Sequence, residues 1–117
     1  MDDKKLAPGL KGSTFQEVSA MLEKILQKET AETPKEMAIL SHGLALAEWY
    51  LADSDERRDA KNKLFKTSEE ILQGLGFTFE EIVAINVFFR KRRDVLEELK
   101  REIEKKIKEG VRTKCRN

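Results

Sequence analysis

The motif Thr-x-x-Glu occurs four times in this chain and constrains its fold more than any other feature. In each copy, the threonine oxygen can accept a hydrogen bond from a free amide in the first turn of a helix. The glutamate can reach back to the amide of the threonine. The four pairs are Thr14 with Glu17, Thr33 with Glu36, Thr67 with Glu70, and Thr78 with Glu81. Four such helix starts among 117 residues predict a helical protein.

Strands are not expected, because no stretch alternates apolar and polar residues over five or more positions. We therefore predict an all-α fold, a bundle of four main helices with an overlong C-terminal helix. The expected helices cover residues 15–28, 34–52, 53–75 and 78–110. Gly76 is a natural left-handed cap for the third helix. The box at Thr67 leaves open whether this helix is kinked or broken.

Two segments are apolar almost all round and predict the centre of the bundle. They run from Met37 to Leu51 and from Ile82 to Phe89. Small residues in the first segment, Ser41, Gly43, Ala45 and Ala47, would let a neighbouring helix approach closely. In the third helix the expected core stripe consists of Ala60, Leu64, Ile71, Leu72 and Leu75, with Phe65 beside them.

The last helix has no stop signal before Gly110, so it spans about 31 residues, or roughly 46 Å. The other helices reach only roughly 22–33 Å. The last helix is therefore expected to extend beyond its neighbours by about two turns. The overhang carries a narrow apolar stripe, formed by Leu96, Leu99, Ile103 and Ile107. Such a stripe predicts an interface with a second copy of the chain or with another protein.

The length suits one domain. We expect a flexible N-terminal lead-in at residues 1–12, which contains Pro8, Gly9 and Gly12. The helical bundle domain would then cover residues 13–110, and a basic polar tail would cover residues 111–117.

The formal net charge of +1 hides an uneven distribution of charge. Residues 90–117 contain 12 basic and 6 acidic side chains, so the rest of the chain is acidic. This basic end either contacts nucleic acid, an acidic partner or the acidic body of another copy of the chain, or it is a solvated helix face with interleaved charges. The candidate nucleic-acid contacts are Arg90, Lys91, Arg92, Arg93, Lys100 and Arg101.

Residues for catalysis or metal binding are scarce, which argues against an enzyme. His42 is the only histidine and has no nucleophile with a partner near it in sequence, so we interpret it as a polar core or interface residue with one hydrogen bond. The acidic cluster at residues 53–59 lacks the glycine and glutamate of a calcium loop. One histidine and one cysteine cannot form a zinc site. Cys115 stands in the polar tail and is interpreted as incidental. We expect no metal, no cofactor and no small-molecule substrate.

Residues 70–82 resemble the core of a helix-turn-helix. The matching positions are Leu75, Gly76, Thr78 and Ile82. The resemblance implies that the helix after Thr78 reads DNA. Leu72 stands where a small residue is usual, and the positions that would face bases carry Phe79, Glu80 and Glu81.

A second stretch, residues 39–44 followed by Leu51 and Ala52, resembles a segment of the small helical subunit of type III-B CRISPR effector complexes. That resemblance implies an all-helical chain that contacts RNA through basic surfaces. The family's longer N-terminal helix and its middle insertion have no counterpart here.

The sequence thus favours a non-catalytic module for protein–protein interaction or assembly, homo-oligomeric through the C-terminal helix. The alternative is a nucleic-acid-binding accessory or regulatory protein, which includes a small subunit of an RNA-guided complex. No run approaches 18 apolar residues, so no membrane span is expected. The lack of a secretory signal and the single cysteine fit a cytoplasmic protein. Abundant Lys and Glu with few Gln and Asn are also typical of thermophilic proteins.

Overall fold

The computed structural model describes residues 9–115, and the side chains of residues 9–111. Its elements are α1 (Gly12–Gln27), α2 (Pro34–Leu51), α3 (Asp55–Gly74), α4 (Phe79–Arg90), the short 3-10 helix η2 (Arg93–Val95) and α5 (Leu96–Cys115). No strand occurs within these residues, so the prediction of an all-α fold is confirmed. Most of the expected lead-in and the side chains of the expected tail, Cys115 included, lie outside the described residues.

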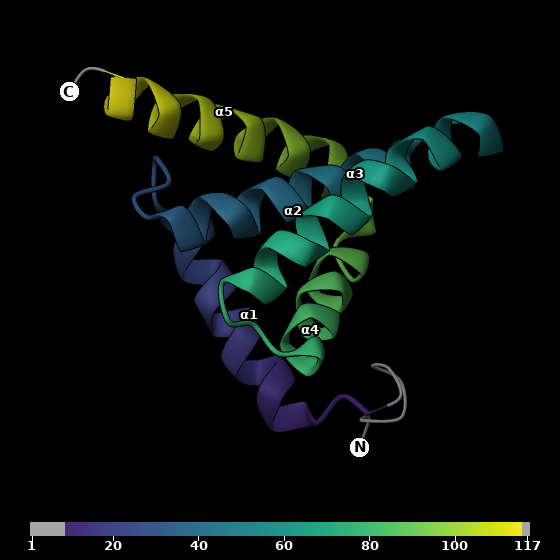
Figure 1. Cartoon of the computed structure of the whole chain (residues 1–117), viewed down its shortest axis with the longest axis horizontal. Coiled ribbons are helices and arrows are strands. Elements are labelled where there is room, and N and C mark those ends of the chain that lie inside the picture. Colours follow the sequence, from purple (N-terminus) through teal and green to yellow (C-terminus); the bar gives the residue numbers. More distant parts are fainter. Residues whose placement is uncertain (1–8, 116–117) are drawn as a thin grey trace.

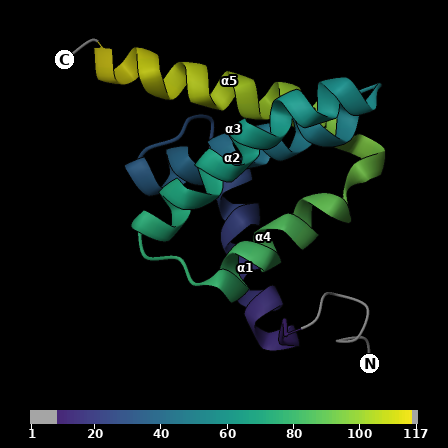
Figure 2. The same ribbon diagram turned by 45° about the vertical axis from the view of Figure 1, so that its right-hand side comes forward.

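Helix α2 is the central element of the bundle. It packs against α3, α5 and α4, while α1 packs mainly against α4 (Figure 1). After a turn of the view by 45°, α5 still runs alongside α2 (Figure 2). The molecule measures 47 × 34 × 27 Å. The two segments that are apolar all round are the interior of α2 and of α4, as the sequence predicted.

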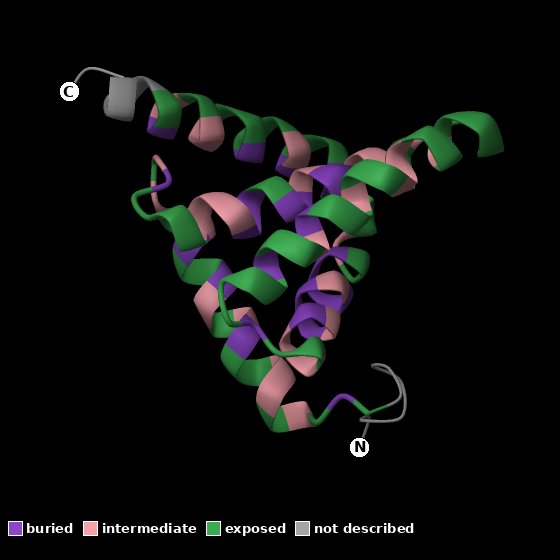
Figure 3. Cartoon of the chain, viewed as in Figure 1, coloured by how far each residue is buried: buried purple, intermediate pink, exposed green. Residues whose placement is uncertain are grey.

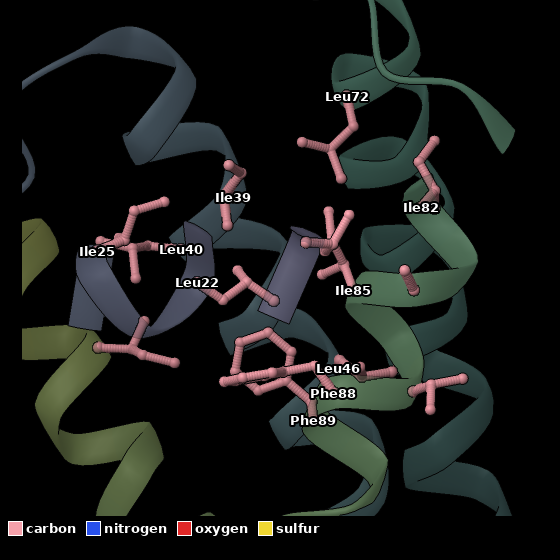
Figure 4. Close-up of a cluster of buried hydrophobic side chains, with 14 of the residues drawn as sticks. Leu22, Ile25, Ile39, Leu40, Leu46, Leu72, Ile82, Ile85, Phe88 and Phe89 are labelled. Carbon is pink, nitrogen blue, oxygen red and sulfur yellow. The ribbon is translucent and has the colours of Figure 1, made fainter. Parts of the chain in front are cut away.

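The core lies where α1, α2, α3 and α4 meet (Figure 4). Phe88 and Phe89 are both fully buried, and their rings meet edge to face with centroids 5.3 Å apart. Gly43 of α2 makes this packing sterically feasible, because a Cβ atom there would lie 2.6 Å from Cζ of Phe89. The expected close approach of a neighbouring helix to α2 therefore occurs at this glycine.

Two of the four Thr-x-x-Glu boxes start helices. At Thr78 both hydrogen bonds of the capping box form, with Glu81 as the partner. At Thr33 the hydroxyl accepts from the amide of Glu36, but the carboxylate of that glutamate accepts from the amide of Glu32 instead. The other two predictions are wrong, because α1 is preceded by Lys11 and the third box lies inside α3.

Helix α3 is continuous through Thr67, whose hydroxyl donates to the carbonyl oxygen of Lys63 at 2.9 Å. The helix starts after Ser54, whose side chain accepts from the amide of Arg57. It ends in a Schellman motif. Here Gly76 has a positive φ of 101°, and the amide of Phe77 bonds the carbonyl oxygen of Leu72 at 3.1 Å.

The single overlong helix expected over residues 78–110 does not exist. The chain leaves the α-helical path between Arg90 and Leu96, where η2 redirects it. Arg92 closes the end of α4, because its guanidinium donates to the carbonyl oxygen of Phe88 at 3.2 Å. No glycine or proline marks this break. We attribute it to tertiary packing, because the turn brings the apolar stripe of α5 against α2.

Described residues near the two expected boundaries of the bundle are buried, at Leu10 and at Gly110. Leu10, within the expected lead-in, is buried in the core, and the amide of Lys11 donates to Glu80 at 2.9 Å. Gly110 does not end the last helix, which continues to Cys115. Instead Gly110 is buried, and a Cβ atom there would lie 3.0 Å from the carbonyl oxygen of Ala31.

Candidate protein interface

The stripe on α5 that the sequence assigned to an oligomer interface belongs to the chain's own core. Leu96, Leu99 and Ile103 are buried, and Ile107 is half-buried and packed against the core. Because α5 turns back along α2, it has no apolar overhang of the kind that the sequence suggested. The interpretation of these four residues as a free surface is therefore wrong.

The basic residues before α5 point to different neighbours. Lys91 lies 5.8 Å from the ring centroid of Phe15, and Arg93 lies 5.3 Å from that of Tyr50. The guanidinium of Arg92 stacks on Phe88 at 3.6 Å and lies 3.5 Å from the carboxylate of Glu23. The remaining candidates are Arg90 and Arg101, which are exposed, and Lys100, which is half-buried. The run therefore divides among α1, α4 and α2 and does not form one basic track.

The two nucleic-acid resemblances involve largely buried segments. In a helix-turn-helix the second helix must enter a DNA groove. Here that helix is α4, whose residues are buried or half-buried except for Phe79 and Arg90. In the stretch 39–44 only Ser41 is exposed. These segments serve core packing.

Helix α3 carries two apolar faces, and only one of them is used within the chain. The inner face contains Leu72, fully buried, Ser68, buried, and Phe65, half-buried. These residues pack toward α2 and the core. The stripe that the sequence predicted as the core contact of α3 is thus wrong for most of its members.

A second side of α3, about 100° around the helix from the inner face, is exposed, and we call it the outer face. It consists of Ala60, Leu64, Thr67, Ile71 and Leu75. Leu64 is 50% exposed, Ile71 is 52% exposed and Leu75 is 42% exposed. Figure 3 shows exposed ribbon along the near side of α3, over much of the helix. Large apolar side chains at helical spacing with no partner inside the chain are typical of an interaction surface.

The two borders of the outer face differ in shape and in charge. Toward α2 lies a groove of about 300 Å³, lined by Pro34, Met37, Ala38, Ser41, Ser68 and Ile71. On the other border stand Lys63 and Glu70, both exposed. Within the described part of the chain, neither of these two side chains forms an ion pair. The outer face is therefore an apolar strip with one mixed-charge border.

A polar network lies behind the groove. His42 is fully buried, with Nδ1 at 2.7 Å from Ser68 Oγ and Nε2 at 2.6 Å from Asn86 Oδ1. Burial lowers the pKa of His42, and the bond to Asn86 and the charge of Glu69 offset only part of this effect. A neutral ring can donate from Nε2 to Asn86 Oδ1, while the Ser68 hydroxyl, which also lies 2.7 Å from the carbonyl oxygen of Phe65, can donate to that oxygen or to Nδ1. The sequence predicted one hydrogen bond, whereas the structure provides two.

A further hollow with charged side chains in its walls lies between α1 and α2. It has a volume of about 600 Å³, and its walls mix lysines with glutamates. Lys28 lies 2.6 Å from Glu36 and 2.8 Å from Glu32. The hydrogen bonds that Lys28 donates to these two carboxylates raise the pKa of Lys28. Burial opposes ionisation of Glu36, but the bonds from Lys28 and from the Glu32 amide outweigh it and lower the pKa of Glu36. These three charges thus satisfy one another.

Two kinds of site are absent from the part of the chain that the structure describes, namely a metal cluster and a membrane span. Within it, no three His, Cys, Asp or Glu side chains are grouped so that they could hold a metal ion. None of its helices combines the length and the apolar character that a membrane span requires.

No protein-family model matches this chain, and comparisons with curated proteins and with solved structures found no match. The function is therefore argued from the site alone.

Sequence reasoning missed the outer face as an interface because it assigned those residues to the core. A usable signal was present, since α3 carries more apolar positions than one packed face needs. Leu64 and Ile71 belong to one stripe, and Phe65 and Leu72 belong to another. Pattern alone does not tell which stripe packs inside the chain.

Proposed function

We propose that this protein is a non-catalytic protein–protein interaction module that binds its partner through the outer face of α3. One observation carries the proposal, namely that Leu64, Ile71 and Leu75 form an exposed apolar strip. Covering the exposed part of each side chain would contribute about 2 kcal/mol at 25 cal/mol per Å². Because Leu96, Leu99 and Ile103 are buried against the rest of the chain, the interface is proposed on α3 and not on α5.

Site-specific photo-crosslinking in the native cells tests this function. A photoreactive amino acid replaces Ile71 in one variant and Val111, which is 49% exposed on α5, in a matched control. We expect a discrete protein adduct from position 71 that is absent from position 111. The adduct is identified by mass spectrometry. If position 71 gives no adduct, or both positions give the same adducts, the outer face is not the functional interface.

A further inference from the structure

We propose that the partner on the outer face is a second copy of this chain, with the two α3 helices paired antiparallel about a two-fold axis. This inference rests on the proposed function, because it names the occupant of the same surface. Its basis is that the outer face is complementary to itself in shape and in charge.

The shape argument follows from the spacing of the outer face. Residues 60, 64, 67 and 71 follow the alternating steps of four and three that pair helices. Leu64 and Ile71 are large, while Ala60 and Thr67 are small. With the two-fold axis near residues 65 and 66, Leu64 of one copy meets Thr67 of the other, and Ile71 meets Ala60. Each layer then joins one large and one small side chain.

The charge argument concerns the mixed-charge border. Lys63 and Glu70 lie seven residues apart, so they stand about two turns apart on the same border of the outer face. An antiparallel two-fold pair brings this border of one copy against the same border of the other. Lys63 of each copy then lies beside Glu70 of its partner, which gives two ion pairs per dimer. A parallel two-fold pair would instead place this border of one copy against the opposite border of the other, so Lys63 and Glu70 would not meet.

The self-complementarity favours a second copy over an unrelated protein. A two-fold interface uses one patch twice, so every contact that it needs must be present within that patch. Here the apolar layers and both signs of charge are present on one face of one helix. Lys63 and Glu70 have no ion pair elsewhere in the described part of the chain, and they are free to meet a partner.

The first experiment measures the mass of the full chain in solution by light scattering over a range of concentrations. We expect the mass of two chains. The double variant Leu64→Glu with Ile71→Glu should have the mass of one chain and unchanged far-UV circular dichroism, because both side chains are half exposed. The matched control Val95→Glu changes a residue that is 48% exposed outside α3 and should remain a dimer.

The second experiment exchanges charges and needs no apolar substitution. It therefore tests the antiparallel pairing of two α3 helices even if the double variant fails to fold. Lys63→Glu and Glu70→Lys should each weaken self-association about tenfold, because two attractive pairs become repulsive. An equimolar mixture of the two variants should recover dimers. In the mixed dimer, glutamates of one chain face lysines of the other at both positions.

The outcomes separate the inference from the proposed function. If the chain has the mass of one chain at every concentration, the inference that its partner is a second copy is wrong. If the mixture of the two charge variants fails to recover dimers, the antiparallel pairing is wrong. If crosslinking at position 71 then captures a different protein, the proposed function stands while the inference fails. If it captures a second copy of this chain and the mixture dimerises, both stand.

Discussion

At the scale of single residues, His42 is a buried polar group where three helices meet. Its two ring nitrogens bond Ser68 of α3 and Asn86 of α4, so one side chain of α2 joins three helices. Phe65 stacks on the ring with centroids 5.1 Å apart. Burial disfavours the charged form of the ring, so a proton on it would cost the folded chain stability. The stability of the bundle is therefore coupled to the protonation of one residue.

We expect the free energy of unfolding to fall as the pH falls below about 6.5, the ordinary pKa of histidine. In the folded chain burial lowers the pKa of His42, so below pH 6.5 the unfolded state binds a proton that the folded state does not. Stability then decreases with falling pH, by at most about 1.4 kcal/mol per pH unit, until the folded pKa is reached. Denaturant titrations between pH 7.5 and 5.5 measure this slope.

The matched variant is His42→Gln, which removes the only histidine of the chain. Its absolute stability is lower because the amide fits the network less well, but its stability should vary little over the same pH window. Carboxylates add little slope there, since most are already ionised. If the stability of the unmodified chain and that of His42→Gln depended on pH in the same way, His42 would not be the titrating group.

Gly43 provides a second test at this scale. In Gly43→Ala the new Cβ atom would lie 2.6 Å from the fully buried ring of Phe89, so the ring must shift within a packed core. We expect a net loss of about 1–3 kcal/mol, even though alanine favours the helix. The control is Gly74→Ala, where nothing lies within 4 Å of the new atom. Equal stability of the two variants would contradict the packing argument.

At the scale of elements, the sequence predicted the all-α class and the first three helices well, but it missed the division of the fourth helix and the internal faces of the helices. The ends of α2 and α3 agree with prediction because Thr33, Ser54 and Gly76 act through local hydrogen bonds and backbone angles. The break after Arg90 could not be predicted, since no local signal marks it. It depends on how the stripe of α5 packs against α2, which is a property of the assembled bundle.

The four capping boxes allow a test in which the same substitution has different effects. Thr33→Ala and Thr78→Ala should each cost about 1 kcal/mol, because each removes a side-chain bond to the first turn of a helix. Thr67→Ala should cost nothing or slightly stabilise, since Thr67 lies inside α3 and alanine favours helix. Denaturation at low protein concentration measures all three. A loss of about 1 kcal/mol in Thr67→Ala would indicate that α3 restarts there.

At the scale of the whole molecule, two helices carry apolar stripes that the sequence could not assign to the inside or the outside. The stripe on α5 was predicted to face a partner, and it packs within the chain at Leu99 and Ile103. The stripe on α3 was predicted to face the core, and it is exposed at Leu64 and Ile71. Both errors have one physical cause. Whether a stripe is buried depends on the direction in which its helix runs across the bundle. For α5 this direction is set by the turn at η2, which no local sequence signal marks.

The consequence can be tested on α5. Ile103→Ala removes three buried carbon atoms from a side chain with no exposed surface, so we expect it to cost about 2–5 kcal/mol through lost burial and a cavity. Val111→Ala changes a half-exposed side chain of the same helix and should alter stability by no more than about 0.5 kcal/mol. Denaturant titration of both variants measures the difference.

Replacing Leu99 and Ile103 together by Glu separates the two roles of the α5 stripe more sharply. If the stripe were a surface for a second copy, the double variant would change the mass in solution and keep its helicity. Because both side chains are buried here, two carboxylates would be forced into the core, which is prohibitively costly without partners. We therefore expect the far-UV circular dichroism signal of the folded bundle to be lost. If the double variant instead stays fully helical and has the mass of one chain, the interface would lie on α5 and not on α3.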